Sequence, residues 1–300
     1  MKQKKHPNFI IIGAMKAATT SLYTYLKQHP DVFMSAIKEP MFFNNFQKVN
    51  NFKVHGRKTK KITTFDQYYS LFDAVKNEKA IGEASPSYIF NKDCPQLIRK
   101  YLPETKIIAV LRQPVDRAYS NFLHARRADR EPISDFESAF NKEEERKAEN
   151  WSPLYYYKGK GYYTKQLERY YSLFPKENIK ILLFEGLVKN PIETSQEIFE
   201  FLNVDNTFIP NTSKKANVSG TPKGIFGWLI MKLRYYNLIP NIQFSNYLPA
   251  FIIQFLFKSA YKKAEPLNKE VSKRLTQKFY KEDILTLEKL IGKDLQHWLG

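Results

Sequence analysis

Short apolar runs that alternate with amphipathic stretches constrain the fold of this chain more than any other feature of its sequence. Four runs have the unbroken apolar character of buried parallel strands, at residues 8–13, 79–82, 106–111 and 178–184. Between and after them lie stretches with helical periodicity, at residues 19–29, 94–101, 114–127, 133–148, 163–174 and 191–202. Strands that alternate with helices are typical of a parallel sheet with right-handed connections. The sequence therefore predicts an α/β fold with a central parallel sheet flanked by helices.

The chain is long enough, at 300 residues, to bury the core of one large domain or of two small ones. No repeat and no low-complexity linker divides it, so we expect a single domain over residues 1–300. Amphipathic stretches at 272–280 and 282–291 predict two helices that pack back on the sheet. Residues 225–266 show no clear pattern and are expected to cover the core or an acceptor site. The uncharged part at 235–257 contains prolines and amides that argue against a membrane span, and peripheral membrane contact stays open.

The charge balance narrows the class of ligand. Lys and Arg number 48 against 30 for Asp and Glu, a net charge of +18 that attracts nucleic acid, an anionic membrane or a phosphorylated small molecule. The single cysteine, Cys94, excludes an internal disulfide framework and favours a reducing compartment. The five histidines lack the spacing of metal ligands. We therefore expect no metal site and a cytoplasmic protein, in which the apolar run that begins at residue 9 belongs to a first strand and not to a signal peptide.

The segment after the first predicted strand has the chemistry of an anion site. Gly13 ends the apolar run, and Lys16 and three hydroxyl residues at 19–21 follow before a helical pattern begins. A loop that enters a helix offers free backbone N–H groups, to which the hydroxyls add donors and Lys16 a positive charge. In a kinase-type phosphate loop a lysine immediately precedes the Ser or Thr, whereas Ala18 holds that place here. The loop therefore favours phosphate binding of another kind, with a capped helix and an exposed lysine as the alternative.

This loop resembles the 5′-phosphosulfate loop of sulfotransferases that use PAPS (3′-phosphoadenosine 5′-phosphosulfate), written G-x-x-K-x-G-T-[TS]. The resemblance implies a P-loop-like phosphate-binding loop in which Lys16 contacts the transferring sulfuryl group and its bridging oxygen. The implied nucleotide-binding residues are Lys16, Ala17, Ala18, Thr19, Thr20 and Ser21. Ala18 departs from the family pattern, which has glycine at this place. Alanine costs little free energy there if φ is negative and more if φ is positive.

A carboxylate beside an aromatic pair follows the first predicted helix. Glu39 lies between Lys38 and Pro40, just before Phe42 and Phe43. A catalytic base has to reach the acceptor proton, and apolar neighbours raise the proton affinity of a carboxylate. The stretch is similar to the K-E-x-x-[FY]-F segment of the glycan-modifying branch of the family. The similarity implies Glu39 as the base, with Lys38 and Phe42 as substrate contacts. A surface ion pair between Lys38 and Glu39, and core packing of the aromatic pair, are the alternatives.

The strand predicted at 106–111 runs into a second anion-binding pattern. Arg112 leaves the carboxyl end of this strand, where open parallel sheets bind ligands, and Pro114 suits the first turn of the next helix. An arginine fork matches a phosphate monoester, and Ser120 lies two turns further along. The run resembles the family motif R-x-P-x-x-R-x-x-S. The resemblance implies that Arg112 and Ser120 bind the 3′-phosphate of PAPS.

Three further segments resemble the family. The pattern G-E-x-S-P-x-Y at 82–88 implies that Ser85 and Tyr88 lie near the acceptor. The stretch at 160–170 resembles R-G-x-Y-x-x-Q-L-x-x-W and implies a nucleotide contact for Tyr163. The segment at 217–224 resembles the late loop that folds over the 3′-phosphate. From it the resemblance implies Lys223 and Gly224 as contacts.

Together these motifs predict a sulfotransferase of bacterial type. It would move the sulfuryl group of PAPS to a hydroxyl or amine and release PAP (3′-phosphoadenosine 5′-phosphate) without a metal. The glutamate base favours a carbohydrate acceptor, while a small-molecule or lipid-linked acceptor and the oligomeric state stay open. One alternative is a kinase-like phosphoryl transferase, against which the place of the lysine argues. The other is a basic nucleic-acid-binding protein, for which the sequence has no recognised motif.

Overall fold

A five-stranded parallel sheet forms the centre of the molecule in the computed structural model, which describes residues 5–47, 52–53, 62–128, 130–213, 220–222, 261–263 and 265–300. Its strands lie in the order β2-β3-β1-β4-β5, and each neighbouring pair is parallel. The strands are β1 (Phe9–Gly13), β2 (Val32–Met34), β3 (Ala80–Ala84), β4 (Lys106–Leu111) and β5 (Ile179–Leu183). The predicted α/β fold with a parallel sheet is confirmed.

The four predicted strands are present, with ends within two residues of the predicted ones, because their apolar side chains are buried on both faces of the sheet. All five residues of β1 and all five of β3 are buried. Fully buried runs of this kind are typical of parallel sheets that helices cover on both sides. The edge strand β2 was not predicted. Three residues are too short a run to show a strand pattern.

Helices connect the strands and close the chain. They are α1 (Thr19–Leu26), α2 (Phe42–Asn45), α3 (Phe65–Tyr69), α4 (Cys94–Tyr101), α5 (Pro114–Arg127), α6 (Phe136–Asn141), α7 (Glu143–Ala148), α8 (Tyr163–Tyr171), α9 (Phe184–Lys189), α10 (Pro191–Phe201), α13 (Lys269–Phe279) and α14 (Lys281–Ile291). The helix predicted over 133–148 is wrong, because two helices occupy that stretch. Asp135 caps the first helix by accepting the Ser138 N–H at 2.7 Å. That helix ends at Lys142, which is also the N-cap residue of the second.

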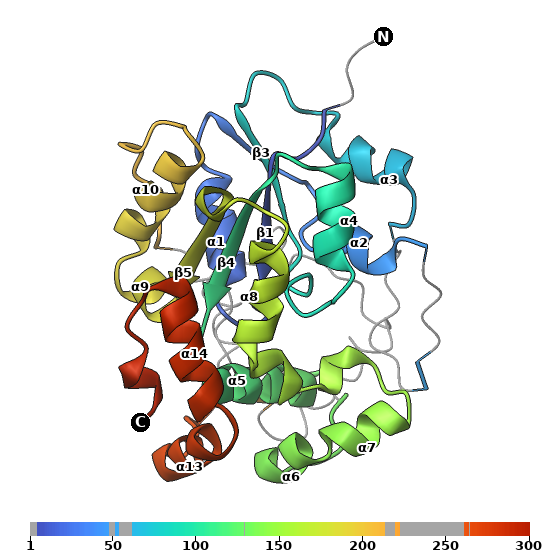
Figure 1. The fold of residues 1–300 in the computed structure, drawn as a ribbon, viewed down its shortest axis with the longest axis vertical. Helices are drawn as coiled ribbons and strands as arrows, with labels where there is room; N and C mark the ends of the chain where they lie inside the picture. The colour runs from blue at the N-terminus through green and yellow to red at the C-terminus, as the bar shows by residue number, and fades with distance from the viewer. Residues whose placement is uncertain are drawn as a thin grey trace.

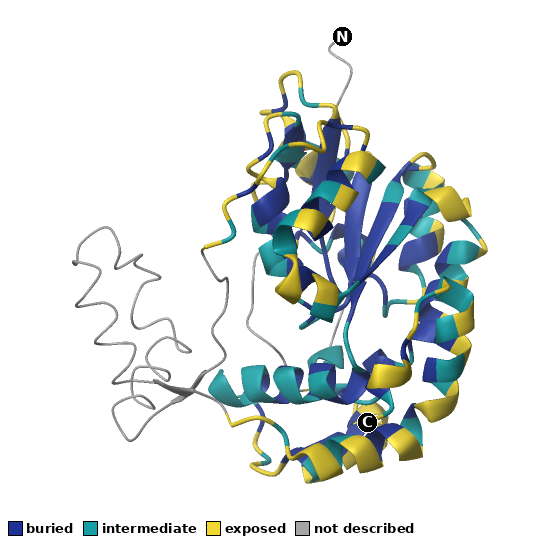
Figure 2. Cartoon of the chain, turned by 90° about the vertical axis from the view of Figure 1, so that its left-hand side faces the viewer, coloured by how far each residue is buried: buried dark blue, intermediate teal, exposed yellow. Residues whose placement is uncertain are grey.

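The helices form layers on both faces of the sheet. In the view of Figure 1, α8 lies in front of the strands and α1 behind them. Figure 2 shows buried residues along the strands and exposed residues on the outer sides of the helices. The two predicted C-terminal helices are present, but they pack on other helices instead of on the sheet, α13 on α5 and α14 on α8.

The order of the strands places a crevice at the carboxyl ends of β1 and β4. These two strands are neighbours, but the chain leaves β1 through α1 towards β2 on one side and leaves β4 through α5 towards β5 on the other. Ligands bind at such a switch point in open α/β sheets. Helix α5 runs across the carboxyl ends of the strands (Figure 1). The loops that follow β1 and β4 therefore meet where a ligand is expected.

A two-stranded antiparallel sheet lies beside α5. It pairs β6 (Gly220–Pro222) with β7 (Tyr261–Lys263). The residues predicted to fold over a 3′-phosphate, Lys223 and Gly224, lie outside the described residues, as does most of the segment predicted to cover the core or acceptor site. Among the helices that the structure describes, none has the length and apolar character needed to cross a membrane.

Candidate functional site

The loop between β1 and α1 has the sharp turn of an anion-binding loop. Gly13 is required at its start because a side chain there would overlap Ile89. Lys16 (φ 70°) and Ala18 (φ 61°) both adopt the left-handed conformation. Non-glycine residues with positive φ store strain and cluster at functional sites. The turn leaves the first N–H groups of α1 without intrahelical partners and available to an anion.

Ala18 is therefore a residue at which glycine would fit better. It is the N-cap residue of α1, at φ 61° and ψ 20°, and its side chain makes no capping hydrogen bond. The left-handed conformation costs an L-residue about 1–2 kcal/mol. The departure from the family pattern thus carries a cost in stability while the backbone keeps the shape that glycine would give it.

The Ala18→Gly variant is expected to be more stable than the natural chain. The gain should be about 0.5–1 kcal/mol, since relief of the left-handed strain exceeds the extra chain entropy that glycine has when unfolded. The free energy of unfolding in urea measures this effect. Ala17→Gly is the matched control and should destabilise the protein, because Ala17 is buried and lacks a positive φ. A less stable Ala18→Gly protein would contradict this account of the turn.

Lys16 lies among several charged groups in the crevice. Burial and then the charge of Arg127 lower the pKa of Lys16 to about 8, and Glu39 acts in the opposite direction. Arg112 and Lys38 also lower it by smaller amounts. Residues from three separate segments therefore share one electrostatic environment with Lys16. A negatively charged ligand would find a concentration of positive charge there.

Arg112 joins the two predicted anion-binding loops. Its Nη1 donates to the backbone carbonyl of Lys16 at 3.2 Å, and its guanidinium lies over the ring of Phe184, 4.4 Å from the centroid. Its Nε–H is buried and has no hydrogen-bond partner among the described residues. A buried donor without a partner is costly unless a ligand or water accepts from it. The guanidinium is thus held in place, and its buried Nε–H is available to a ligand.

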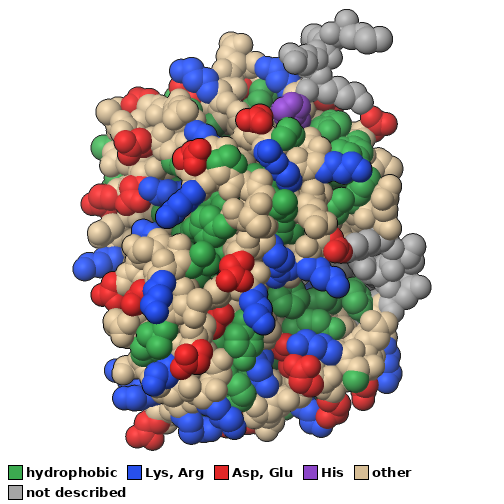
Figure 3. Space-filling view, in the orientation of Figure 1, with side chains coloured by type: hydrophobic (Ala, Val, Ile, Leu, Met, Phe, Trp, Pro, Cys, Tyr) green, Lys and Arg blue, Asp and Glu red, His purple; other side chains and the backbone are tan. Residues whose placement is uncertain are grey.

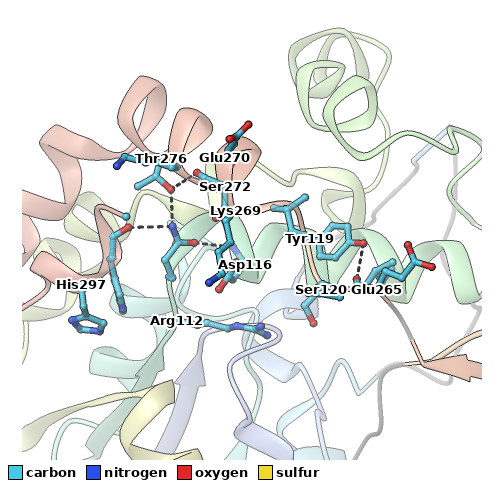
Figure 4. A pocket seen from close by; sticks show the side chains of 17 residues that line it. Arg112, Asp116, Tyr119, Ser120, Glu265, Lys269, Glu270, Ser272, Thr276 and His297 are labelled. Carbon is cyan, nitrogen blue, oxygen red and sulfur yellow. Dashed lines mark hydrogen bonds between the residues drawn. The ribbon is translucent and has the colours of Figure 1, made fainter.

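A pocket of about 600 Å³ opens beside Arg112. Ser120 lines it together with Arg112, as the sequence predicts, and α13 forms its other wall. Figure 4 shows Arg112, Asp116 and Ser120 on one side and Thr276, Ser272 and Glu270 on the other. The volume and the basic group at the inner end suit an organic phosphate.

Tyr163, a predicted nucleotide contact, is fully buried. Its hydroxyl donates to the carbonyl of Arg112 at 2.9 Å, and its N–H donates to Asp283 Oδ2 at 2.9 Å. The bond to the carbonyl fixes the backbone at Arg112, and the bond to Asp283 fixes Tyr163 itself. A direct contact between Tyr163 and a nucleotide stays a prediction, while the hydrogen bonds indicate a positioning role.

The predicted base, Glu39, lies on the same side of the sheet as Lys16. It has a positive φ of 61°, as does Met41 at 49°, so the turn that presents it is strained in the same way as the first loop. Lys38 Nζ lies 2.6 Å from Glu39 Oε1, and both side chains are partly exposed. The ion pair considered in the sequence analysis is therefore present. It is compatible with a base, because a partly exposed pair of this kind contributes little free energy and can open.

The other predicted acceptor contacts form the wall behind Glu39. Phe42, Ser85 and Tyr88 are fully buried. Phe42 stacks on Tyr68, with ring centroids 4.5 Å apart, and the Ser85 hydroxyl accepts the Met41 N–H at 3.0 Å. Their contact with an acceptor stays a prediction. Because none of the three is exposed, we expect them to support the turn at Glu39.

Glu83 is a site residue that the sequence analysis missed. It is fully buried, and it accepts hydrogen bonds from Ser85 Oγ at 2.7 Å and from the Tyr68 hydroxyl at 3.2 Å. Burial raises its pKa to about 7, against the effect of these hydrogen bonds. Ser85 links it to the turn at Met41. A carboxylate inside the otherwise apolar strand β3 was the sequence signal for such a group.

His124 on α5 is a second residue that the sequence analysis missed. Burial, followed by the charges of Lys16 and Arg127, lowers its pKa to about 4, so the imidazole is neutral at pH 7. Arg127 Nη2 lies 3.3 Å from His124 Nδ1, and a guanidinium only donates, so the proton of the neutral ring is assigned to Nε2. The ring can therefore donate to a ligand oxygen. The sequence feature that could have identified His124 was its position one helical turn after Ser120, on the same face of α5.

Residues 7–208 match the family model described as "Sulfotransferase family". The sulfotransferase from Alicyclobacillus acidocaldarius has a similar structure, with a TM-score of 0.75 and 31% sequence identity, over 98% of this chain and 99% of that one. Within the described residues, no group of three or more His, Cys, Asp or Glu side chains has the arrangement of a metal site.

Curated relatives are much longer than this chain. The membrane-associated sulfotransferase kil1 of Dictyostelium discoideum is 38% identical over 116 residues, which are 39% of this chain and 22% of that protein. The bifunctional heparan sulfate N-deacetylase/N-sulfotransferase 4 of Mus musculus is 25% identical over 304 residues, 98% of this chain and 31% of that protein. This chain thus spans less than a third of either relative.

Proposed function

The chain belongs to the sulfotransferase family, and we propose that it transfers the sulfuryl group of PAPS to a hydroxyl or amine of a glycan. The observation that carries the proposal is the hydrogen bond from Arg112 Nη1 to the Lys16 carbonyl, at 3.2 Å. It brings two anion-binding loops to one crevice, as a nucleotide with a phosphate on each side of its ribose requires. An ordinary mononucleotide needs only one of the two loops.

The residues of the crevice fit this nucleotide. The N-terminus of α1, Lys16 and the hydroxyls of Thr19 and Thr20 would hold the 5′-phosphosulfate. Arg112, through its free Nε–H, and Ser120 would hold the 3′-phosphate. PAPS supplies an activated sulfuryl group when it is bound. The loop residues would hold its 5′ end at the N-terminus of α1.

We assign the base to Glu39 and the leaving-group contact to Lys16. Glu39 takes the proton of the acceptor hydroxyl or amine as a new S–O or S–N bond forms on the face of sulfur opposite the leaving group. The bond between sulfur and the bridging oxygen breaks, and its electron pair stays on the 5′-phosphate of PAP. Lys16 donates to this oxygen as negative charge develops on it.

The pKa of Lys16 predicts how PAP binding changes with pH. Lys16 carries its full charge below its pKa of about 8 and loses it as the pH rises through that value. The dissociation constant of PAP is therefore expected to be flat between about pH 7 and 7.5, where the phosphates of PAP are fully ionised, and to rise above pH 8, towards about tenfold per pH unit, since one proton is linked to binding. In Lys16→Arg, whose guanidinium stays charged, the curve should be flat to pH 9.5. Calorimetric titrations at four pH values measure both curves, and a flat curve for the natural protein would contradict the assignment.

A glycan acceptor is supported by the turn at Glu39 and by the heparan sulfate N-deacetylase/N-sulfotransferases among the relatives. Small-molecule and lipid-linked acceptors are the alternatives, and sulfation of either in place of a glycan would contradict this part of the proposal. A cytoplasmic location and a bacterial origin stay predictions.

The alternative of a nucleic-acid-binding protein has less support. Figure 3 shows Lys and Arg side chains interspersed with Asp and Glu over the face in view, without one continuous basic patch. A protein that binds nucleic acid through its backbone presents clustered basic residues on one face or along a helix. The net charge of +18 is thus not gathered on this face.

A thermal-shift comparison of PAP, AMP and ATP tests the proposed function. A ligand that binds only the native state raises the melting temperature more the more tightly it binds, so PAP should raise it by several degrees more than AMP or ATP at equal concentration. Labelled PAPS should then transfer its sulfur to a glycan with free hydroxyl or amino groups. Magnesium-dependent ATP hydrolysis with no response to PAP would favour the phosphoryl transferase instead.

A further inference from the structure

The two loops at the carboxyl ends of β4 and β5 are joined on their outer side by the C-terminal segment. Gln113 follows Arg112, and its Nε2 donates to Thr276 Oγ1 at 2.6 Å and to the Trp298 carbonyl at 3.3 Å. Trp298 in turn donates from its Nε1 to Glu185 Oε1 at 3.2 Å. The end of the chain therefore connects the residue after Arg112 with the first turn of α9.

These contacts form a closed loop of residues around Arg112. Glu185 directly follows Phe184, whose aromatic ring lies under the Arg112 guanidinium. Arg112 is followed by Gln113, which bonds to Trp298, and Trp298 bonds to Glu185. Glu185 follows Phe184, whose aromatic ring contacts Arg112 and so completes the loop. Trp298 is 2% exposed and the Thr276 side chain is fully buried, so two of the partners are fixed by the core, while Gln113 and Glu185 are partly buried.

Gln113 also shapes the start of α5. Its Oε1 accepts the Asp116 N–H at 2.8 Å, which makes Gln113 the capping residue of the helix that carries Ser120. One side chain thus fixes three things: the first turn of α5, the wall that α13 forms in the pocket, and the strand end at which Arg112 leaves the sheet. All three border the pocket that Arg112 and Ser120 line.

We propose that Gln113 and Trp298 are positioning residues that set Arg112 and Ser120 for the 3′-phosphate, so that the C-terminal segment determines the preference for PAP over AMP. This inference rests on the proposed function. A guanidinium and a hydroxyl grip a phosphate only when both are held within a fraction of an ångström, and a small displacement of such groups costs a large factor in binding. AMP has no 3′-phosphate, so its binding does not depend on this geometry.

The ratio of the dissociation constants of AMP and PAP tests the inference. Gln113→Met keeps the length of the side chain and removes its donors and acceptor, and the ratio is expected to fall about tenfold while the AMP constant changes less than about twofold. Gln277→Met is the matched control. It removes only the bond from Gln277 Nε2 to the Leu299 carbonyl at 2.8 Å, on the exposed side of the same segment, and should leave the ratio unchanged.

A second variant keeps the test decisive if Gln113→Met does not fold. Trp298→Phe retains an aromatic ring in the core, leaves a small cavity and loses the bond to Glu185, and the ratio should fall about threefold. A natural-level ratio in Gln113→Met or Trp298→Phe, with a lower melting temperature, would show a purely structural role and overturn the inference. If the natural protein itself shows no preference for PAP, the proposed function fails, and the inference fails with it.

Discussion

The Lys16→Ala variant is expected to lose about 10²–10³-fold in kcat for sulfuryl transfer. In the mechanism we propose, the ammonium group neutralises charge that develops on the bridging oxygen only as the bond to sulfur breaks, and removal of one such preorganised donor typically costs this factor. The place of Lys16 supports this role, because its backbone is held by Arg112 and its side chain shares one environment with Glu39. Steady-state kinetics with saturating PAPS and acceptor measure the loss.

Lys27→Ala is the control for this result. Lys27 is the exposed C-cap residue at the other end of α1, so its removal changes the net charge by the same amount without touching the crevice. It should keep kcat within about twofold of the natural value. A kcat at the natural level in Lys16→Ala would remove Lys16 from the reaction.

The Glu39→Gln variant is expected to lose about 10²–10⁴-fold in kcat, the usual contribution of a general base. Glutamine keeps the size of the side chain and can still accept the Lys38 hydrogen bond, so the turn should stay intact. PAP binding should change less than about twofold, because in the proposed mechanism Glu39 contacts the acceptor and not the nucleotide. The loss should therefore appear in kcat while the melting-temperature response to PAP stays the same.

Glu104→Gln, an exposed carboxylate far along the chain, is the matched control and should behave as the natural protein does. Full activity of Glu39→Gln would show that another group takes the proton.

The sequence predicted the sheet and most of the helices, since both depend on local patterns. Strand β4 and helices α4 and α5 have the predicted bounds, because apolar runs and an N-terminal proline mark them clearly. The break between α6 and α7 depends on a partner distant in sequence. Glu143 accepts N–H groups of Lys158 and Gly159, and no local pattern announces that contact.

The motifs predicted that Lys16 and Arg112 lie in one site, and a hydrogen bond joins the two residues, while their contacts with a nucleotide stay predictions. The sign of φ at Ala18 was not predictable, because a single sequence does not reveal whether a residue has taken the place of a strained glycine. Glu83 and His124 were missed because their importance comes from burial and from charges on other elements. The role of Gln113 was hidden for the same reason, since its partners lie 163 and 185 residues away.

The central claim is that one nucleotide reaches from Lys16 to Arg112. Calorimetric titration of the protein with PAP, with AMP and with adenosine 3′-phosphate tests it most directly. We expect one PAP per chain, bound at least about tenfold more tightly than either monophosphate. AMP and adenosine 3′-phosphate should compete for the same adenosine position. In Arg112→Ala the affinity for PAP should fall to that for AMP. Two monophosphates bound together without competition, or PAP bound no more tightly than AMP, would contradict it.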